Sequence, residues 1–479
     1  MAIWELKWEW LLAEILGLAG ALLVVFLLIR LIREHRSPTS TMAWGIAILL
    51  LPYVGVPLYL LFGGRKVRRH RRLKGQLFPA SDTRGDADLP APAARLEIVE
   101  TVRVLEGAGY PAVKADNHLE FIASGERAYA RLMEMVAAAK VDIAVTVFIL
   151  GHHHVGRSFV ELLTKKAREG VKVRLLLDAV GSFRTRWGFV APLRQAGGRV
   201  GVFMPILPIG RKWSTHLRTH RKLVAVDGRT AMIGGMNISH EYMGPAPDPK
   251  RWTDACAIVS GPVVDDLLGI FAVDWHFATG EDWEPSPRDW SAAPRPGDTL
   301  MQVVASGPDA DAMPLHDAVL ISMLRAKRRV WIVSPYFIPD DSLLRTLMLL
   351  GRMGRDVRLI VPRRSNHFIA DLARGAFFRD LMGSSVKLFA YRKGMLHTKL
   401  LVIDDEIAMV GSANMDIRSL YLDYELGVLV YSAKEVQVIA DVIRDYQQDA
   451  DRLTWEKGIR KNFATEMAED VCRLFAPIL

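Results

Sequence analysis

The chain carries one motif twice, and this duplication constrains its fold more than any other feature. "THRKLVAVDG" (219–228) and "LHTKLLVIDD" (396–405) each place a histidine two residues before a lysine, then an apolar run and an aspartate. Each copy continues to an asparagine, in "IGGMN" and in "VGSAN". His397 follows His220 by 177 residues, and the lysines, aspartates and asparagines share that offset. The chain is therefore predicted to contain two halves built alike.

Strand and helix patterns alternate around both copies of the motif. Apolar runs typical of buried strands are separated by a run with helical spacing. The strand, helix and strand lie at 141–150, 158–170 and 171–182 in the first half, and at 328–339, 342–354 and 356–362 in the second. This alternation is typical of the α/β class, so we expect an α/β fold in each half.

Two uncharged apolar stretches precede the repeat, at 15–29 and 42–62. They help to explain why 50% of the residues are hydrophobic. A bilayer core requires about 20 apolar residues per helix, which predicts a transmembrane hairpin with segments at about 10–32 and 42–63. Prolines in the second segment leave open a kinked or re-entrant path. A cleaved signal peptide or a buried core helix is the alternative for these stretches.

A basic run follows the second segment. "GRKVRRHRRLKG" (64–75) contains seven lysines and arginines and no acid. By the positive-inside rule, the large C-terminal part and the short N-terminus are expected on the cytoplasmic side. The run at 65–74 is expected to contact anionic lipid headgroups. Because the net charge of +9 depends on this run, it does not indicate nucleic acid as a partner.

The composition suggests boundaries between the parts of the chain. A stretch rich in Pro, Ala and Asp precedes the first half, and a stretch rich in Pro and Trp lies between the halves. The expected parts are a membrane anchor at 1–75, a linker at 76–109, a first half at 110–279, a connection at 280–298 and a second half with a C-terminal helix at 299–479.

The motif predicts its own local geometry. Residues i and i+2 of a strand share a face, so the histidine and the lysine of each copy project together. The aspartate has the opposite parity and is expected to brace the hairpin rather than to touch a substrate. The motif positions are His220, Lys222, Asp227 and Asn237 in the first half, and His397, Lys399, Asp404 and Asn414 in the second.

Two such half-sites suit displacement at a phosphodiester. A neutral imidazole can attack phosphorus while a second, protonated imidazole donates to the leaving alkoxide. Lysines and asparagines would hold the phosphoryl oxygens where charge builds. We therefore group the histidines, lysines and aspartates of both copies as the candidate catalytic set, with the asparagines in support. The alternative is a structural repeat whose histidines only pack in the core.

No metal or cofactor is expected in this site. The histidines at 152–154 are adjacent, and on an extended segment they would point to alternate faces and share no ion. The only cysteines, Cys256 and Cys472, form no disulfide framework, which suits a reducing compartment.

Further residues have two interpretations each. Arg218, Arg374 and Arg418 are candidate headgroup contacts, with surface or structural ion pairs as the alternative. In the tail, apolar residues recur with helical spacing, which favours core packing over a second membrane contact. These tail residues are Trp455, Ile459, Phe463 and Met467.

The motifs resemble those of the phospholipase D superfamily, whose signature is HxKxxxxD followed by Gly-Gly/Ser-x-Asn. The resemblance covers roughly residues 110–479 and is stronger still to bacterial cardiolipin synthases. "RTHRKLVAVDG", "PYFIPDD", "GMLHTKLLVIDD" and "GSANMDIRS" are similar to that family's stretches, as is "PYVGVPLYLLFGGRK" near the N-terminus. The sequence departs from the family's pattern at Asp423, where asparagine is usual, and at "GHHHVG" (151–156), where an aspartate is common.

The resemblance implies a fold and further site residues. The implied fold is two phospholipase D-like mixed-sheet domains packed about a pseudo-twofold axis, preceded by the transmembrane hairpin. In the family, an acid from the other half orients each catalytic histidine. Glu425 and Asp254 occupy the matching positions, which assigns Glu425 to His220 and Asp254 to His397. Buried acids that pair with charged loops are the alternative.

The resemblance also implies an activity, namely transfer of a phosphatidyl group between two phosphatidylglycerol molecules in the bacterial cytoplasmic membrane. The products would be cardiolipin and glycerol, by way of a phosphohistidine on His220 with His397 as the acid. A membrane-bound phospholipase D that makes phosphatidic acid is the first alternative, and a non-catalytic lipid-binding scaffold is the second. The acyl chains, the second phospholipid and the oligomeric state are left open.

A two-histidine mechanism implies a dependence on pH. One imidazole must be neutral and the other protonated, so the rate should fall on both sides of an optimum. The orienting carboxylates are expected to hold the pKa of the donor histidine above its usual value of about 6.5.

Overall fold

The computed structural model divides the chain into two compact units, Met1–Arg69 and His70–Leu479. Each unit is described by itself. The described residues are 2–33, 38–59, 74, 98–205, 217–285, 290, 295–307, 313–456 and 461–474. Within the expected basic run at 65–74, only Lys74 is among them.

The N-terminal unit is helical. Helix α1 (Ala2–Arg33) packs against α2 (Pro38–Leu50) and α3 (Pro52–Leu58) through a small apolar cluster formed by Leu27, Leu31, Ile48 and Tyr59. The second apolar segment, expected at 42–63, is not one continuous helix. It breaks at Leu51, because the proline that follows lacks a backbone N–H and disfavours helical geometry at the residue before it. Residues 60–63 lie outside the described part of the chain.

None of the helices among the described residues is both long enough and apolar enough to cross a bilayer.

The first half of the large unit forms seven strands of a mixed sheet. Their spatial order is β1-β7-β6-β5-β2-β3-β4. The strands are β1 (Lys114–Ile122), β2 (Asp142–Val147), β3 (Lys172–Asp178), β4 (Arg199–Phe203), β5 (Leu223–Val226), β6 (Thr230–Gly234) and β7 (Cys256–Ser260). The central strand β2 is buried along its whole length, as expected when helices cover both faces of a sheet.

The second half repeats this arrangement as β8-β16-β14-β13-β9-β11-β12, and β17 (Ala450–Arg452) is added at the edge. The strands are β8 (Thr299–Ser306), β9 (Arg329–Val333), β11 (Asp356–Pro362), β12 (Lys387–Tyr391), β13 (Leu400–Ile403), β14 (Ile407–Gly411) and β16 (Glu425–Val430). A short parallel pair, β10 (Phe337–Ile338) and β15 (Met415–Asp416), lies apart from this sheet.

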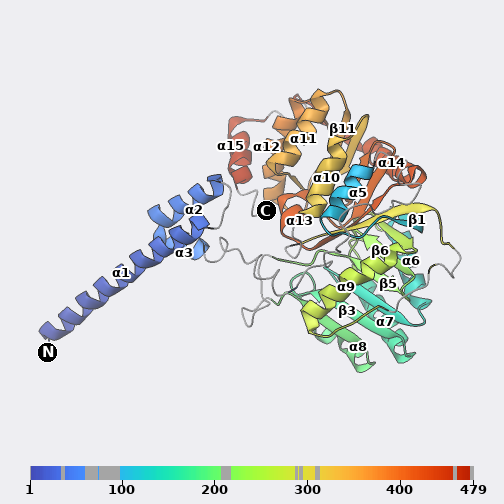
Figure 1. The fold of residues 1–479 in the computed structure, drawn as a ribbon, viewed down its shortest axis with the longest axis horizontal. Helices are drawn as coiled ribbons and strands as arrows, with labels where there is room; N and C mark the ends of the chain where they lie inside the picture. Colours follow the sequence, from blue (N-terminus) through green and yellow to red (C-terminus); the bar gives the residue numbers. More distant parts are fainter. Residues whose placement is uncertain are drawn as a thin grey trace. The chain divides into compact units, whose positions relative to one another are not determined.

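The two halves join through their first strands. β1 and β8 pair antiparallel, so the two seven-stranded arrays and β17 form one 15-stranded sheet. Because the strand order is the same outward from this pair, an approximate twofold axis relates the halves. Figure 1 shows them as neighbouring lobes, with β3 and α7 in green and α11 and β11 in orange. The duplication predicted from the repeated motif is confirmed.

Helices connect and cover the strands. The first half contains α6 (Gly125–Ala137), α7 (His154–Arg168), η3 (Gly188–Val190), α8 (Ala191–Gln195) and α9 (Val263–Thr279). The second half contains α10 (Pro314–Leu324), α11 (Asp341–Arg352), α12 (Phe368–Met382), α13 (Ile417–Tyr421), α14 (Ala433–Gln448) and α15 (Phe463–Leu474). The apolar stripe of α7, for example, lies in the core of the first half through Val155, Phe159 and Leu163.

Two parts of the chain differ from expectation. Helix α5 (Val99–Gly107) lies within the range expected for the linker. Its residues Val102 and Leu105 are one turn apart and are both buried, so this part of the chain packs against the protein. In the tail, core packing is the wrong interpretation for three of the four apolar residues. The exposed fractions are 48% for Trp455, 78% for Phe463 and 49% for Met467, and Ile459 lies outside the described residues.

The motif aspartates lie at the hairpin turns. Each directly follows its strand, β5 or β13, whereas the motif histidine precedes that strand. Asp227 and Asp404 both have left-handed backbone conformations, with φ of 52° and 49°. Each carboxylate accepts hydrogen bonds from three consecutive backbone N–H groups just before a strand of the same half. The donors are Lys140, Val141 and Asp142 for Asp227, and Lys327, Arg328 and Arg329 for Asp404. These contacts fit the bracing role expected for both aspartates.

We predict that Asp404→Ala lowers stability and leaves the chemistry of the folded protein intact. The change removes the acceptor of three N–H groups and places alanine, which adopts positive φ less readily than aspartate, at this position. We expect a loss of about 3 kcal/mol or more in the free energy of unfolding. Thermal unfolding of the detergent-solubilised protein measures it.

Asp405→Ala is the matched control, because the Asp405 carboxylate is 44% exposed and pairs with arginines near the surface. It should cost less than about 1 kcal/mol. If Asp404→Ala abolished turnover at low temperature without shifting the unfolding transition, the aspartate would belong to the catalytic set after all.

Candidate active site

Two short backbone bridges bring the halves together at the motif histidines. Thr219 pairs with Tyr424, and Thr253 pairs with Leu396, each as an isolated parallel bridge. The backbone N–H of His220 donates to the Tyr424 carbonyl at 2.9 Å, and that of His397 donates to the Thr253 carbonyl at 2.7 Å. In each bridge the next residue of the partner segment is an acid, so the bridge delivers a carboxylate to the histidine of the other half.

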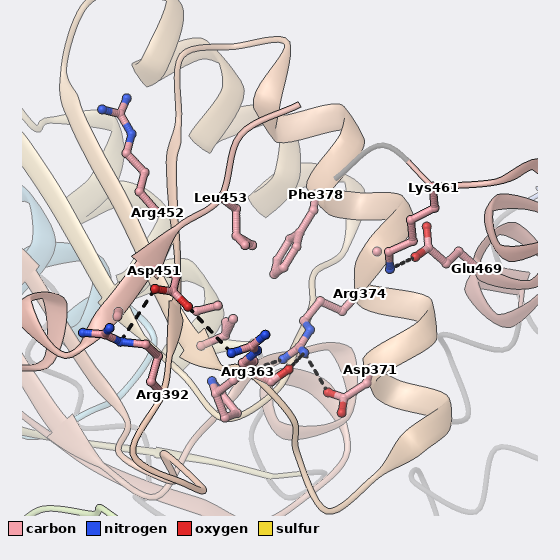
Figure 2. A pocket seen from close by; sticks show the side chains of 15 residues that line it. Arg363, Asp371, Arg374, Phe378, Arg392, Asp451, Arg452, Leu453, Lys461 and Glu469 are labelled. Atoms are coloured by element: carbon pink, nitrogen blue, oxygen red, sulfur yellow. Dashed lines mark hydrogen bonds and ion pairs between the residues drawn. The ribbon is translucent and has the colours of Figure 1, made fainter. Parts of the chain in front are cut away.

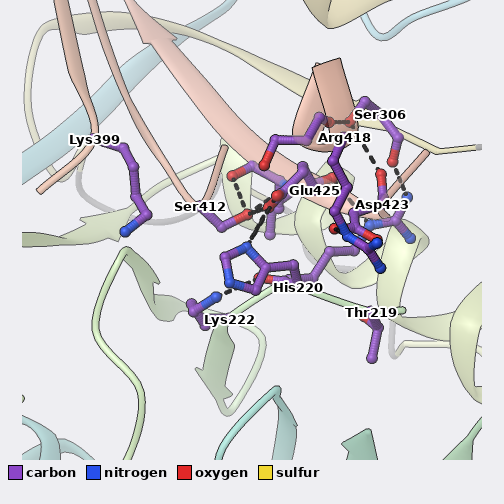
Figure 3. Close-up of polar contacts among 12 residues, drawn as sticks. Thr219, His220, Lys222, Ser306, Lys399, Ser412, Arg418, Asp423 and Glu425 are labelled. Carbon is purple, nitrogen blue, oxygen red and sulfur yellow. Dashed lines mark hydrogen bonds and ion pairs between the residues drawn. The ribbon is translucent and has the colours of Figure 1, made fainter. Parts of the chain in front are cut away.

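Each histidine contacts that carboxylate through Nδ1. His220 Nδ1 lies 2.9 Å from Glu425 Oε1, and His397 Nδ1 lies 2.7 Å from Asp254 Oδ2. Both carboxylates are fully or almost fully buried. Figure 3 shows the Glu425 carboxylate above the His220 ring, with Lys222 beside the ring. With Nδ1 engaged, Nε2 is the ring nitrogen left to meet a substrate.

The residue two positions before each motif asparagine lies against the acid of the same half, which explains why it is glycine or serine. A Cβ on Gly235 would come within 2.3 Å of Asp254 Oδ1, so this position must lack a side chain. The equivalent residue of the second half, Ser412, donates its hydroxyl to Glu425 Oε2. Each half therefore holds its own acid with this position and presents it to the histidine of the other half.

The lysines stand next to the histidines, as the strand periodicity predicted. Lys222 Nζ donates to the His220 carbonyl at 2.7 Å, and Lys399 Nζ lies 2.7 Å from His397 Nδ1. Both lysines are buried. Their ammonium groups are therefore held close to the imidazoles by the fold.

The asparagines occupy the two sides of the site differently. Asn237 accepts a hydrogen bond from the Ile149 backbone N–H at 3.0 Å, which ties it to the end of β2. Asn414 lines the cavity described below, and its buried Oδ1 has no hydrogen-bond partner among the described residues.

A cavity of about 500 Å³ opens at His220. Both halves line it, the first with Phe148, Arg218 and His220 and the second with residues 336–338, 366–370 and 414–423 in part. Phe368 and Ile369 at its edge are 74% and 51% exposed. His397 is only 4% exposed and packs between Tyr242 and Trp252, with ring centroids 5.1 and 5.3 Å away. His220 is thus the histidine that meets the cavity.

Two of the three candidate arginines lie at this cavity. Arg218 donates to the Met204 carbonyl at 2.9 Å, and Arg418 donates to Asp423 at 2.9 Å. The third, Arg374, lies in a different pocket and does not line the cavity. At Asp423, one buried carboxylate oxygen lacks a hydrogen-bond partner among the described residues.

One buried arginine was not recognised in the sequence. Arg221 stands between the motif histidine and lysine and is 1% exposed. Its guanidinium pairs with Asp274 at 2.7 Å and donates to the backbone carbonyls of Glu425 and Ser306 at 3.1 Å. It thereby fixes the backbone of the acid that contacts His220. The equivalent residue of the second half is Thr398, so the repeat gave no signal for this position.

Burial dominates the electrostatics of the site. It lowers the pKa of His220 and of His397 well below the usual value, and the nearby lysines lower both further. Burial also lowers the pKa of Lys222 to about 7 and that of Lys399 to about 8. The expectation that the carboxylate raises the pKa of the donor histidine is therefore wrong. The loss of water on burial lowers that pKa by more than the carboxylate raises it.

The same burial acts on the acids in the opposite direction. It raises the pKa of Glu425 to about 7 and that of Asp254 to about 6, although the lysines oppose the change. Burial also raises the pKa of Asp423 to about 7. Burial thus favours the neutral forms of these groups, and a bound anion would favour the charged forms of the cations.

The sequence suggested that the three consecutive histidines lie on an extended segment, but the structure differs. They lead into α7, and the rings of His152 and His153 are 3.9 Å apart, with His240 4.5 Å from His153. Within the described part of the chain, no group of His, Cys, Asp and Glu residues is arranged to hold a metal ion.

Comparisons with known proteins agree with this geometry. The family described as "Cardiolipin synthase, PLD-like domain" matches residues 132–275 and 319–449, and "Phospholipase_D-nuclease N-terminal" matches 22–64. The crystal structure of a phosphatidylserine synthase from Haemophilus influenzae superposes with a TM-score of 0.58 at 17% identity, over 79% of this chain and 98% of that one. The fold is therefore that of the phospholipase D-like proteins.

Curated relatives narrow the class. Cardiolipin synthase 1 of Bacillus anthracis is 32% identical and covers 93% of this chain and 90% of its own. The cardiolipin synthase of Geobacillus kaustophilus is 31% identical over 98% and 95%, and the major cardiolipin synthase of Bacillus subtilis is 30% identical over 97% and 98%. The chain belongs to the cardiolipin synthases of the phospholipase D superfamily, a family of phosphatidyltransferases. The resemblance stated from the motifs is confirmed.

We predict that the protein takes up protons when an anion binds in the site. At pH 8, Lys222 with a pKa of about 7 is mostly neutral, and Lys399 with a pKa of about 8 is half neutral. A bound phosphodiester favours their charged forms and raises both pKa values. Calorimetry of dimethyl phosphate binding in buffers of different ionisation enthalpy should show proton uptake at pH 8, and affinity should fall about tenfold per pH unit for each proton taken up.

Lys222→Met should reduce this uptake, whereas Lys434→Met, at a lysine whose side chain is 85% exposed, should leave it unchanged. Binding at pH 8 without net proton uptake would mean that both lysines are already charged before dimethyl phosphate binds.

Proposed function

We propose that this chain, as a cardiolipin synthase, transfers a phosphatidyl group between two phosphatidylglycerol molecules through a covalent intermediate on His220. The observation that carries this proposal is the pair of complete half-sites, in which each histidine contacts a carboxylate of the other half. His220 is assigned as the nucleophile because it opens onto the cavity, whereas His397 is enclosed by aromatic rings. The contacts of Glu425 and Asp254 support their role as orienting acids.

In the first step, the Nε2 lone pair of His220 attacks phosphorus and a phosphorus–nitrogen bond forms. The bond from phosphorus to the headgroup glycerol breaks, and His397 gives its proton to the leaving alkoxide. In the second step, a hydroxyl of another phosphatidylglycerol attacks phosphorus and returns a proton to His397, and the phosphorus–nitrogen bond breaks. The products are cardiolipin and glycerol, and both histidines regain their starting states.

The phosphodiester supplies the negative charge that this mechanism requires. Burial lowers the pKa of His397 well below its usual value, which disfavours the imidazolium form that donates the proton. A bound phosphate anion favours the imidazolium and the ammonium forms together. Lys222, Lys399 and the amides of the two motif asparagines would then stabilise the phosphoryl oxygens as charge develops.

The cavity also offers acceptors for a polyol headgroup. Asn414 Oδ1 and one carboxylate oxygen of Asp423 are buried and lack partners among the described residues. Both residues line the cavity that contains His220. Unsatisfied buried acceptors gain most from a ligand that brings hydroxyl groups, and the headgroup of phosphatidylglycerol carries two of them. We therefore assign these two oxygens to headgroup recognition.

The N-terminal unit supports attachment to a membrane. In α1, apolar side chains are exposed on several sides of the helix, including Leu18 at 65%, Phe26 at 60% and Ile32 at 69%. Apolar surface of this extent requires cover, and lipid acyl chains would provide it. We propose a hairpin in the cytoplasmic membrane, with the basic residues at 65–72 against anionic headgroups and the catalytic unit on the cytoplasmic side. Lys74, the last cation of the expected run at 65–74, is instead buried and pairs with Asp274. A broken second segment suits a re-entrant path.

We predict that purified protein converts phosphatidylglycerol vesicles to cardiolipin and free glycerol in equal amounts, with little phosphatidic acid. The acceptor hydroxyl is present at high local concentration in the bilayer and outcompetes water. EDTA should not reduce the rate, since the proposed steps use only side chains of the chain. Thin-layer separation of the lipids and an enzymatic glycerol assay measure the products.

The variants His220→Ala and His397→Ala should both lose turnover, and only a protein that retains His220 can form an acid-labile phosphatidyl adduct. Peptide mapping of quenched reactions locates that adduct. Phosphatidic acid as the main product would instead indicate a membrane-bound phospholipase D, and an adduct on His397 would reverse the roles of the two histidines.

We predict that Asp423→Ala lowers kcat/KM for phosphatidylglycerol about 10- to 100-fold, because a buried acceptor for a headgroup hydroxyl is lost. Asp423→Asn keeps an acceptor oxygen and should lose less than about tenfold. Phosphatidylmethanol has no headgroup hydroxyl, so as donor it should lose little from either change. Asp282→Ala, at a side chain that is 93% exposed, is the control. Equal losses with both donors would give Asp423 a structural role only.

A further inference from the structure

Helix α15 is packed with its polar side inward. Its one buried residue is Glu469, which is 0% exposed and pairs with Arg379 and Lys461. A surface helix of a soluble domain normally buries its apolar stripe and exposes its charges. Here the charged side faces the body of the protein.

The apolar side of the same helix faces outward. Four large side chains recur at intervals of four, four and three residues and so form one stripe along the helix. The exposed fractions are 78% for Phe463, 49% for Met467, 45% for Val471 and 78% for Leu474. We call these four residues the α15 stripe.

This orientation is fixed by specific contacts with α12. Arg473 pairs with Asp380 at 2.8 Å, and its guanidinium lies 4.5 Å from the centre of the Phe377 ring. A Cβ on Gly375 would come within 2.2 Å of the Glu469 carboxyl group, so α12 makes room for this acid. Rolling α15 to bury the stripe would separate Glu469 from its two cations and leave buried charges unpaired. The outward stripe is therefore the orientation that the packing specifies.

A basic pocket of about 660 Å³ adjoins the helix, between α12, α15, β12 and the edge strand β17. Five cations and three acids line it, namely Arg363, Arg374, Arg392, Arg452 and Lys461 with Asp371, Asp451 and Glu469. Figure 2 shows Arg363 and Arg374 side by side at its floor, with Phe378 and Leu453 forming an apolar wall. The pocket shares no lining residue with the catalytic cavity.

The cations of this pocket are only partly satisfied by its acids. The side chain of Arg363 is 69% exposed and lies 3.9 Å from Asp451, and that of Arg392 is 51% exposed and lies 3.7 Å from the same acid. One carboxylate at these distances leaves both guanidinium groups able to bind an anion. Guanidinium groups favour phosphate, which they can contact through two N–H groups at once.

We propose that α15 and the basic pocket form a membrane-contact site on the catalytic unit, which binds the surface of an anionic bilayer. The α15 stripe would enter the boundary between headgroups and acyl chains, as interfacial amphipathic helices do. The phosphate of an anionic phospholipid would occupy the pocket beside it. This apolar stripe next to a net positive pocket matches the layered chemistry of such a surface, and the contact does not depend on the reaction catalysed.

The native cysteines provide a reporter for this contact. Cys472 lies on α15 and is half-buried, whereas Cys256 is 1% exposed in the core. A thiol-reactive, environment-sensitive fluorophore should therefore label Cys472 selectively. The labelled full-length protein is placed in nanodiscs of phosphatidylcholine alone or mixed with phosphatidylglycerol. We expect a blue-shifted emission and quenching by lipid-borne quenchers in the anionic discs, and a weaker effect in the neutral ones.

Two sets of variants separate the parts of the site. Phe463→Ser combined with Met467→Ser should abolish the blue shift, and Val438→Ser on α14, 45% exposed, is its control. Arg363→Gln combined with Arg392→Gln should remove the preference for anionic discs, because each lost cation lowers the affinity for them by about fivefold. Lys434→Gln is the control.

Three outcomes would overturn the proposal. An emission that is the same in detergent and in both kinds of disc would show that the stripe stays in water. A blue shift that survives the serine substitutions would show that the stripe does not make the contact. A shift that rises with protein concentration in lipid-free detergent would identify a second copy of the chain as the occupant of the stripe.

Discussion

The catalytic site depends on a reciprocal exchange of carboxylates between the two halves. Each half builds a histidine, a lysine and an acid, but the acid contacts the histidine of the other half. The exchange rests on two isolated backbone bridges, Thr219 with Tyr424 and Thr253 with Leu396, which place histidine and acid next to each other. Neither half alone can orient its own histidine in this way. The duplicated fold and the antiparallel pairing of β1 with β8 are therefore conditions for the chemistry.

The exchange is symmetric, but its surroundings are not. Arg221 ties the backbone of Glu425 to Asp274, whereas the hydroxyl of the equivalent Thr398 lies 3.2 Å from the Thr253 carbonyl and 3.4 Å from Tyr446 Oη and reaches neither acid. His220 opens onto the cavity, and His397 is packed between two aromatic rings. A nearly symmetric pair of imidazoles thus meets two different environments. This difference is the physical basis for giving one the role of nucleophile and the other that of acid.

The sequence predicted the parts of the site that follow from strand periodicity and from the repeat. The histidine and the lysine share a face because they are two residues apart, and the second copy distinguishes this pattern from chance. Glu425 and Asp254 could be assigned only through a family resemblance, because more than 140 residues separate each acid from its histidine. Their pairing depends on how the two halves meet, which local pattern does not encode.

Other features were missed for reasons that are also physical. Arg221 directly follows the histidine and precedes β5, and its partners lie in distant elements, so the motif gave no signal for it. The direction of the histidine pKa shift was wrong because it depends on how much water the fold excludes. The tail residues have the periodicity of a buried helix, and periodicity alone cannot say which side of a helix faces the protein. There, the buried ion pairs of Glu469 decide the orientation.

The shape of the catalytic unit links its chemistry to the surface on which its substrates lie. Helix α12 contributes Phe368 to the rim of the catalytic cavity and Arg374 to the basic pocket, so one rigid element connects the two sites. An N-terminal anchor alone would raise the local concentration of the catalytic unit near lipid and leave its orientation free. A second contact through α15 would restrict that orientation, because α12 fixes the cavity relative to the contact. The transferase outcome then follows from geometry as well as from chemistry, since a cavity held against lipid meets another headgroup hydroxyl more often than it meets water.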